Sequence, residues 1–199
     1  MLQATDYGNR LETDIENKIG GIIWMDGNGA PETICTFNNS KYDIVYYCGC
    51  LSNNWDPREK SLGGSEQAVV WLSTYWASQG YSVAVYGSLK ENVKFNNVNY
   101  FLASKFIASI RYKTLVLWRT FGFNGIIEWN LKADKIVLDL HDTDYPSKLA
   151  ENLDQVDLIM TKSKFHGYSI YYNFSQKYKE KLQKKLRCLM NGVRVDNFV

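Results

Sequence analysis

Short apolar runs alternate with amphipathic segments along most of the chain. Residues 44–48, 114–118 and 135–140 are nearly continuous apolar runs, which are typical of parallel strands buried on both faces. Residues 81–86 and 158–161 read as further strands. Strands that alternate with helical segments predict an α/β fold, namely a Rossmann-like parallel sheet with helices on both faces.

A helix is predicted to begin at Ser65 and to end before Gly80. Apolar residues recur at helical spacing between them, and Glu66 lies in the first turn, where the helix dipole favours a carboxylate. Serine often caps a helix N-terminus, and glycine often follows a helix C-terminus. The other expected elements are helices at 126–131, 148–153 and 175–186 and weak strands at 93–95 and 98–101.

Residues 1–40 follow a different pattern. Two β-type runs, 22–25 and 33–37, flank an Asp-Gly-Asn-Gly turn signal, which predicts a β-hairpin. We therefore expect an N-terminal extension that contains a hairpin over residues 1–40 and a Rossmann-like domain over residues 41–199.

Charge and hydropathy exclude several classes of protein. The 199 residues have a formal net charge of +2, whereas a dedicated nucleic-acid-binding protein usually has a strong basic excess. No apolar stretch approaches the roughly 18 residues of a membrane-spanning helix, and no signal-peptide pattern is visible at the N-terminus. We expect a cytoplasmic protein that does not bind nucleic acid.

Parallel sheets bind ligands outside the carboxyl ends of their strands, and this rule selects two candidate sites for anions. Gly63 and Gly64 lie just before a helix, where free backbone N–H groups can approach a diphosphate. A tight loop without a ligand explains the paired glycines equally well. Arg119 follows the strand 114–118, where either a phosphate or a loop carboxylate can meet its charge.

The sequence His141-Asp142-Thr143-Asp144 follows the strand 135–140 and has three interpretations. The first is a metal site of the His-Asp type, for which further histidines at suitable positions are missing. The second is an Asp-x-Asp metal clamp formed by Asp142 and Asp144. The third is a single histidine that hydrogen-bonds a polar substrate or moves a proton.

A basic segment lies near the C-terminus. Lys177, Lys179, Lys181, Lys184, Lys185 and Arg187 follow closely on Tyr171, Tyr172 and Phe174. A solvated helix face explains such a run in most proteins. The alternative is a surface that docks on an anionic membrane, with the aromatic residues as its amphipathic part.

Taken in order, several motifs resemble the N-terminal half of a GT-B-fold glycosyltransferase of the GT4-like class (glycosyl transferase family 1, group 1). The resemblance extends over about residues 42–198. The motifs are Trp55-Asp56-Pro57, Gly63-Gly64-Ser65-Glu66 at the start of a helix, the segment 80–86, the strand that ends at His141, the segment 159–166, and Asn191-Gly192-Val193 followed by Phe198.

The resemblance implies the acceptor-side lobe of an enzyme that transfers a hexose from a nucleotide sugar to a glycan or lipid-linked acceptor. Its glycine loop would approach the donor phosphates or sugar, which maps onto Gly63, Gly64, Ser65 and Glu66. His141 would face the transferred sugar as the catalytic residue. Arg119 and Asp142 would line the same cleft. Family members use no metal, so we expect no cofactor beyond the nucleotide-sugar co-substrate.

The second lobe of that family binds the nucleotide with two glutamates that have seven residues between them, and no such pair occurs in this chain. We therefore expect a nucleotide-binding lobe to be supplied in cis or in trans, and negligible activity without it. Two alternatives stay open. One is a non-catalytic module that binds carbohydrate or a protein partner, and the other is a metal-dependent GT-A-type transferase that uses Asp142 and Asp144.

Overall fold

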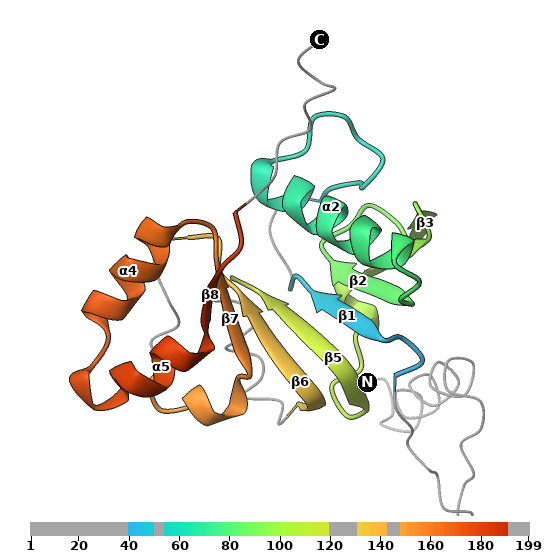
Figure 1. Cartoon of the computed structure of the whole chain (residues 1–199). Coiled ribbons are helices and arrows are strands. Elements are labelled where there is room, and N and C mark those ends of the chain that lie inside the picture. The colour runs from blue at the N-terminus through green and yellow to red at the C-terminus, as the bar shows by residue number, and fades with distance from the viewer. Residues whose placement is uncertain (1–39, 50–53, 120–130, 143–147, 191–199) are drawn as a thin grey trace, which may run out of the picture. The chain divides into compact units, whose positions relative to one another are not determined.

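The computed structural model describes residues 40–49, 54–119, 131–142 and 148–190. Within them, eight strands form one sheet in the order β3-β4-β2-β1-β5-β6-β7-β8, and only β3 runs antiparallel to its neighbour (Figure 1). The strands are β1 (Ile44–Tyr47), β2 (Val83–Gly87), β3 (Val93–Phe95), β4 (Val98–Leu102), β5 (Arg111–Trp118), β6 (Lys132–Asp139), β7 (Leu158–Thr161) and β8 (Leu186–Cys188).

The strand order reverses at β1. The chain first moves outward through β2 and β4, then returns to place β5 on the other side of β1, and continues outward through β6, β7 and β8. Tyr47 pairs with Tyr86 of β2 and with Leu117 of β5, so the carboxyl ends of these three strands lie at one level. Ligands of open α/β sheets bind in the crevice at such a reversal.

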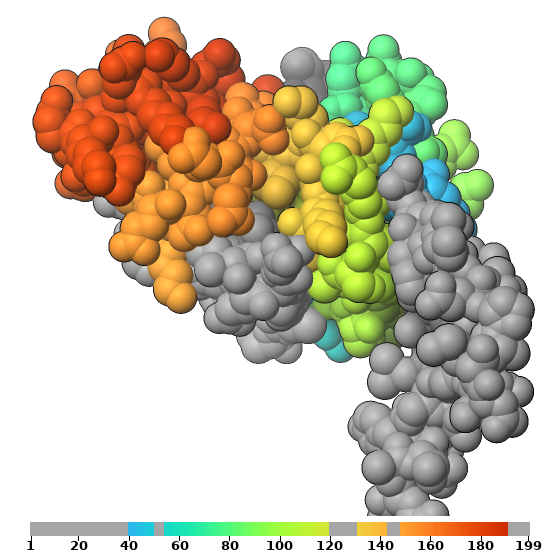
Figure 2. Space-filling view, turned by 90° about the horizontal axis from the view of Figure 1, so that it is seen from below, coloured from blue at the N-terminus to red at the C-terminus, as the bar shows by residue number. Residues whose placement is uncertain are grey.

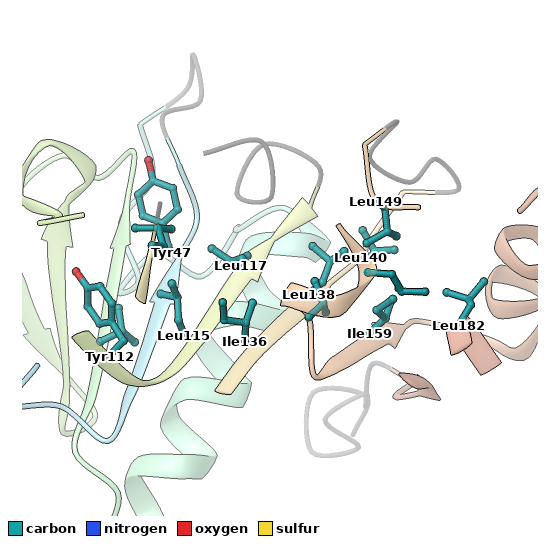
Figure 3. Close-up of a cluster of buried hydrophobic side chains, with 14 of the residues drawn as sticks. Tyr47, Tyr112, Leu115, Leu117, Ile136, Leu138, Leu140, Leu149, Ile159 and Leu182 are labelled. Atoms are coloured by element: carbon teal, nitrogen blue, oxygen red, sulfur yellow. The ribbon is translucent and has the colours of Figure 1, made fainter. Parts of the chain in front are cut away.

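Helices pack on both faces of the sheet, as the sequence predicts. Helix α2 (Gly64–Ser78) buries Val69 and Val70 in a cluster with Ile44 and Tyr46. The alternate residues of β1 face a second cluster, shown in Figure 3, which includes Ile170 of α4 (Lys164–Asn173) and Leu182 of α5 (Lys179–Lys185). Within residues 40–199, the C-terminal segments (orange and red in Figure 2) lie at the opposite end from α2 (turquoise).

Two predicted helices are corrected by the structure. Residues 148–152 form turns that lead into a short 3-10 helix, Leu153–Gln155. Leu149 and Leu153 are both buried in the core, but two buried positions do not make the continuous apolar face of an α-helix. The basic segment 175–186 is divided into a 3-10 turn, Gln176–Tyr178, and α5. The helix α4 before it was not predicted from the sequence.

Other local predictions are confirmed. Helix α2 ends before Gly80, whose φ of +89° suits glycine alone, and the Gly80 N–H donates to the carbonyl of Ala77. The weak strands exist as β3 and β4, joined by Asn96 and Asn97 in left-handed conformation. The chain divides into two units between residues 39 and 40, whereas the expected extension over residues 1–40 and domain over residues 41–199 stay predictions. The predicted N-terminal hairpin and residues 126–130 of the helix predicted at 126–131 lie outside the described residues.

Candidate functional site

The guanidinium of Arg119 joins the start of α2 to the segment after β6 at the carboxyl edge of the sheet. Its Nη2 donates to Ser65 Oγ at 2.9 Å, and its Nε lies 3.3 Å from Asp142 Oδ2. Arg119 directly follows β5, Ser65 lies in the first turn of α2, and Asp142 lies just beyond β6. The start of α2, Arg119 and the segment after β6, which the sequence identifies as candidate ligand sites, therefore meet beside the point at which the strand order reverses.

The conformation of Arg119 is unusual for a residue with a side chain. Its φ is +58°, in the left-handed region, which costs about 1 kcal/mol or more for a residue other than glycine. The guanidinium carbon lies 4.6 Å from the centre of the Trp118 ring, and the side chain is 23% exposed. Such strain persists where the surroundings fix the residue, and it is common at binding sites. Arg119 is thus a fixed cation with one side open to solvent.

The start of α2 leaves backbone uncovered. The N-cap residue is Gly63, with no side-chain cap, so the prediction that Ser65 caps this helix is wrong; its hydroxyl accepts the hydrogen bond from Arg119 instead. A Cβ built on Gly64 meets no described atom within 4 Å, and Gly64 is not among the residues with positive φ. Neither packing nor backbone conformation among the described residues therefore requires glycine at this position.

Glu66 lies at the same helix terminus. Its carboxylate is close enough to Gly63 to meet a Cβ added there, although the end of this side chain is free to rotate. A carboxylate at a helix N-terminus interacts favourably with the helix dipole and competes with an external anion for the free N–H groups. An anion that binds at Gly64 would therefore meet the negative charge of Glu66 at the same helix terminus.

His141 lies just beyond β6 and is tied to a carboxylate of that strand. Its Nε2 lies 3.1 Å from Asp139 Oδ2, and its ring meets the Trp118 ring edge-on with 5.8 Å between centroids. The His141 side chain is only 3% exposed. A ligand can therefore reach at most one edge of the imidazole in this structure.

Asp139 is the centre of a buried polar cluster that sequence reasoning missed. Its side chain is 1% exposed, and besides His141 it accepts the hydroxyl proton of Tyr46 at Oδ2 and pairs with Lys162 Nζ at 2.6 Å from Oδ1. The available signal was an aspartate inside the apolar run 135–140. Nothing in the sequence joins it to Tyr46 or Lys162, because these contacts depend on strand order and register.

Protonation states in this cluster follow from burial and charge. Burial raises the pKa of Asp139, but the hydrogen bond from His141 and the charge of Lys162 outweigh it and lower the pKa below its usual value. Burial, reinforced by the Asp139 charge, raises the pKa of Tyr46 well above its usual value. The same two causes raise the pKa of the buried Cys48 thiol. Asp139 is thus ionised at neutral pH, whereas the phenol and the thiol keep their protons.

The second histidine of the chain lies behind this edge. His166, 5% exposed, donates its backbone N–H to Ser163 Oγ at the start of α4, and its Nδ1 accepts from the Lys162 N–H at 3.4 Å. Burial lowers its pKa, so the ring is neutral at pH 7. Both contacts lie at the N-terminus of α4, where the Ser163 side chain caps the helix.

The two metal interpretations of the segment 141–144 stay predictions. In the part of the chain that the structure describes, no group of three His, Cys, Asp or Glu side chains is arranged to hold a metal ion. Asp142 pairs with Arg119, and Asp144 lies outside the described residues.

The basic segment and its aromatic neighbours separate into exposed and packed residues. Phe174 is buried, whereas Phe165, Tyr168 and Tyr172 on α4 are 74%, 60% and 72% exposed. Several lysines are already engaged: Lys181 pairs with Asp154, Lys184 with Glu180, and Lys185 donates to the carbonyl of Val156. None of the helices in the described ranges is long and apolar enough to span a bilayer.

The fold and this edge define an α/β protein with a Rossmann-like sheet and a polar cluster at the carboxyl ends of β1, β5 and β6. No model of a known protein family matches the chain, and no curated protein matches it either. The geometry and the sequence motifs are therefore the basis of the functional argument.

Proposed function

We propose that this chain is the acceptor-side lobe of a glycosyltransferase, which takes part in the transfer of a hexose from a nucleotide sugar to a glycan or lipid-linked acceptor. The observation that supports it best is the bridge from Ser65 through Arg119 to Asp142. It brings the glycine loop, the cation after β5 and the segment after β6 together at one edge of the sheet, which is where the motif resemblance implies a donor site.

In this proposal Arg119 and the amides of Gly64 and Ser65 bind the donor phosphates. A guanidinium matches the geometry of phosphate oxygens, and a helix N-terminus favours an anion. Arg119 is available for this role because its ion pair is weak: Asp142 is 52% exposed, and exposed pairs contribute about 0–1 kcal/mol. His141 meets the transferred sugar, and phosphate charge is neutralised by side chains and amides without a metal cofactor.

The proposal includes a second lobe. A nucleotide-binding lobe, in cis or in trans, closes the other side of the crevice and positions the donor, and positioning contributes several kcal/mol to catalysis. Residues 1–199 alone are therefore expected to show negligible transfer but to retain weak affinity for phosphate groups. Robust transfer by this chain alone with a nucleotide sugar would contradict that division of roles.

Inorganic pyrophosphate is a direct probe of the proposed phosphate site. In ¹H–¹⁵N NMR titrations, pyrophosphate is expected to shift the amides of Gly64, Ser65 and Glu66 together with the side-chain Nε–H of Arg119. Gly64→Ala is expected to weaken this binding severalfold without loss of stability, because its Cβ enters open space at a helical position.

Gly80→Ala is the matched control variant. The positive φ of Gly80 makes alanine strained there, so this variant is expected to lose stability and keep pyrophosphate binding. Shifts scattered over the surface, or equal binding by Gly64→Ala and the unaltered chain, would contradict a phosphate site at the start of α2.

The alternative functions are separated by two further titrations. A non-catalytic module binds oligosaccharides equally well with His141→Ala, whereas the proposed transferase lobe loses affinity for the sugar. A GT-A-type enzyme binds Mn²⁺ in a manner abolished by Asp142→Ala. Mn²⁺ binding of that kind would replace the metal-independent proposal.

The exposed aromatic residues of α4 favour a second, peripheral role at an anionic membrane on the cytoplasmic side. Phe165, Tyr168 and Tyr172 recur at helical spacing and are mostly exposed, and Lys179 Nζ lies 6.0 Å from the centre of the Tyr172 ring. Aromatic rings beside lysines suit the interface of anionic bilayers. A lipid-linked acceptor would be met at such a surface.

Vesicle sedimentation tests this role. Binding to vesicles that contain phosphatidylserine, but not to purely zwitterionic ones, is expected to fall at least tenfold when Phe165, Tyr168 and Tyr172 are changed to serine. Tyr75→Ser with Tyr81→Ser removes two other exposed rings and serves as the control. Absence of binding to the anionic vesicles, or an equal loss in the control, would exclude membrane docking by α4.

A further inference from the structure

We propose that Asp139 is a positioning residue that holds His141 in the tautomer with hydrogen on Nε2, so that Nδ1 accepts a hydrogen bond from a substrate hydroxyl. The nature of that substrate, a sugar, rests on the proposed function. The tautomer itself rests only on the contacts of Asp139.

Both oxygens of Asp139 are engaged by groups that donate. Oδ1 faces the ammonium of Lys162 at 2.6 Å, and Oδ2 receives the Tyr46 hydroxyl and lies 3.1 Å from His141 Nε2. An ionised carboxylate only accepts hydrogen bonds. The hydrogen between Asp139 and His141 therefore belongs to Nε2.

The charges around Asp139 are paired: its negative charge is matched by the positive charge of Lys162, and the Tyr46 hydroxyl adds none.

This arrangement decides what the imidazole can bind. With Nε2 donating to Asp139, any further hydrogen bond made by the ring must use Nδ1, which has a lone pair and no hydrogen. Nδ1 then accepts from a hydroxyl and repels a fully ionised phosphate oxygen. The two parts of the site thereby bind different groups: Arg119 and the helix amides bind phosphate, whereas His141 binds a sugar hydroxyl.

The tautomer is measurable because His141 and His166 are the two histidines of the chain. Long-range ¹H–¹⁵N correlation spectra of the imidazoles, assigned with His166→Gln, are expected to show His141 as a single Nε2–H tautomer at pH 7. Observation of the Nδ1–H tautomer, or of the doubly protonated ring, would overturn the proposal without any variant of Asp139.

Asp139→Asn keeps the shape of the side chain and removes its charge. It is expected to abolish the single tautomer and to lower activity of the complete enzyme about 10- to 100-fold, as for other residues that orient a functional histidine. Asp157→Asn is the control, because Asp157 also pairs with a lysine but lies just before β7 begins, away from the carboxyl ends of the strands. An unchanged His141 spectrum in folded Asp139→Asn would refute the positioning role.

A second experiment distinguishes a failure of this inference from a failure of the proposed function. UDP-glucose and GDP-mannose are titrated against the unaltered chain and Asp139→Asn, and the His141 signals are followed. Perturbation in the unaltered chain alone is the expected result and supports both proposals. The expected tautomer without perturbation by either nucleotide sugar would retain the role of Asp139 in orienting the ring and overturn the proposed contact with a sugar hydroxyl.

Discussion

The two edges of the sheet use the same kinds of charged residues in opposite ways. At the edge where the strands begin, three ion pairs have side chains that are 33–66% exposed. At the edge where the strands end, Asp139 is 1%, His141 3% and Lys162 14% exposed. The exposed pairs are Lys113–Asp43, Arg111–Asp134 and Lys135–Asp157.

Burial determines what each set of charges contributes. Exposed pairs stabilise a protein by about 0–1 kcal/mol, because water screens them and ordering the side chains costs entropy. A buried charge costs several kcal/mol in lost hydration, which its partners offset, so replacing the whole group with apolar residues is often neutral. The cluster around Asp139 is therefore poorly explained by stability alone, and this difference between the edges supports its functional interpretation.

The largest effect is expected from Lys162→Met, which leaves the Asp139 charge buried without its partner. We expect a loss of about 3–5 kcal/mol in the free energy of unfolding, measured by urea denaturation. Lys135→Met removes the same charge from the opposite edge and is expected to cost about 1 kcal/mol or less. Similar losses in the two variants would show that the edges do not differ energetically.

Tyr46→Phe removes one hydrogen bond to the same carboxylate and leaves the ion pair in place. Hydrogen bonds to charged groups contribute about 1.5–3 kcal/mol, and those between neutral groups about 0.5–1.5 kcal/mol. Tyr112→Phe is the matched control, because the buried Tyr112 hydroxyl donates to the neutral carbonyl of Ile107 at 2.6 Å. If Tyr112→Phe costs as much as Tyr46→Phe, Asp139 is not ionised in the folded protein.

Acid is expected to weaken the folded state partly through Asp139. Its pKa is lower in the folded than in the unfolded chain, so its contribution is complete above the unfolded value of about 3.9 and is lost as pH falls through the folded value. The pKa of Asp157 is lowered as well: burial raises it, but the hydrogen bonds from Lys135 and from the Ile136 N–H, together with nearby lysine charge, outweigh burial.

Urea denaturation between pH 7 and pH 2 measures both contributions. Asp139→Asn and Asp157→Asn are each expected to reduce the loss of stability below about pH 4, by about 1.4 kcal/mol for each unit by which folding lowers the pKa of the replaced aspartate. A steeper acid dependence in Asp139→Asn than in the unaltered chain would mean that folding raises this pKa.

The fold was predictable because it depends on local patterns. The apolar runs of β1, β5 and β6 and the helical spacing of α2 are each visible within a few residues, and Gly80 ends its helix for a local reason. The short helix predicted at 148–153 failed because two leucines at helical spacing do not distinguish an α-helix from a turn with two core anchors.

The site was predictable only in part, because its contacts are long-range. The rule on strand ends identified Arg119, His141 and Asp142 and offered a loop carboxylate as one partner of Arg119, but it did not identify Asp142 as that carboxylate or Asp139 as the partner of His141. Ser65 looked like a helix cap from its local sequence, and only the approach of Arg119, 54 positions away, gives its hydroxyl another role. Asp139 and Tyr46 are separated by 93 positions and meet because β5 alone lies between their strands.

The smallest predicted effect compares two arginines at the two ends of β5. Arg111 is in extended conformation at the exposed edge, whereas Arg119 has a φ of +58° at the other. Glycine tolerates positive φ, but in a strand it is less favourable than alanine by roughly 0.5–1 kcal/mol. Arg119→Gly is therefore expected to be about 1 kcal/mol more stable than Arg119→Ala, and Arg111→Gly less stable than Arg111→Ala.

The sign of each glycine–alanine difference, measured by thermal and urea unfolding of the four variants, is the decisive quantity. Glycine and alanine both remove the arginine contacts, so the loss of those contacts cancels when the two variants at one position are compared. Opposite signs at the two positions would establish that the sheet maintains a strained cation beside the crevice, where a phosphate could use it. A positive preference for alanine at residue 119 would mean that the backbone there is relaxed, and Arg119 would then be no better prepared for a ligand than Arg111.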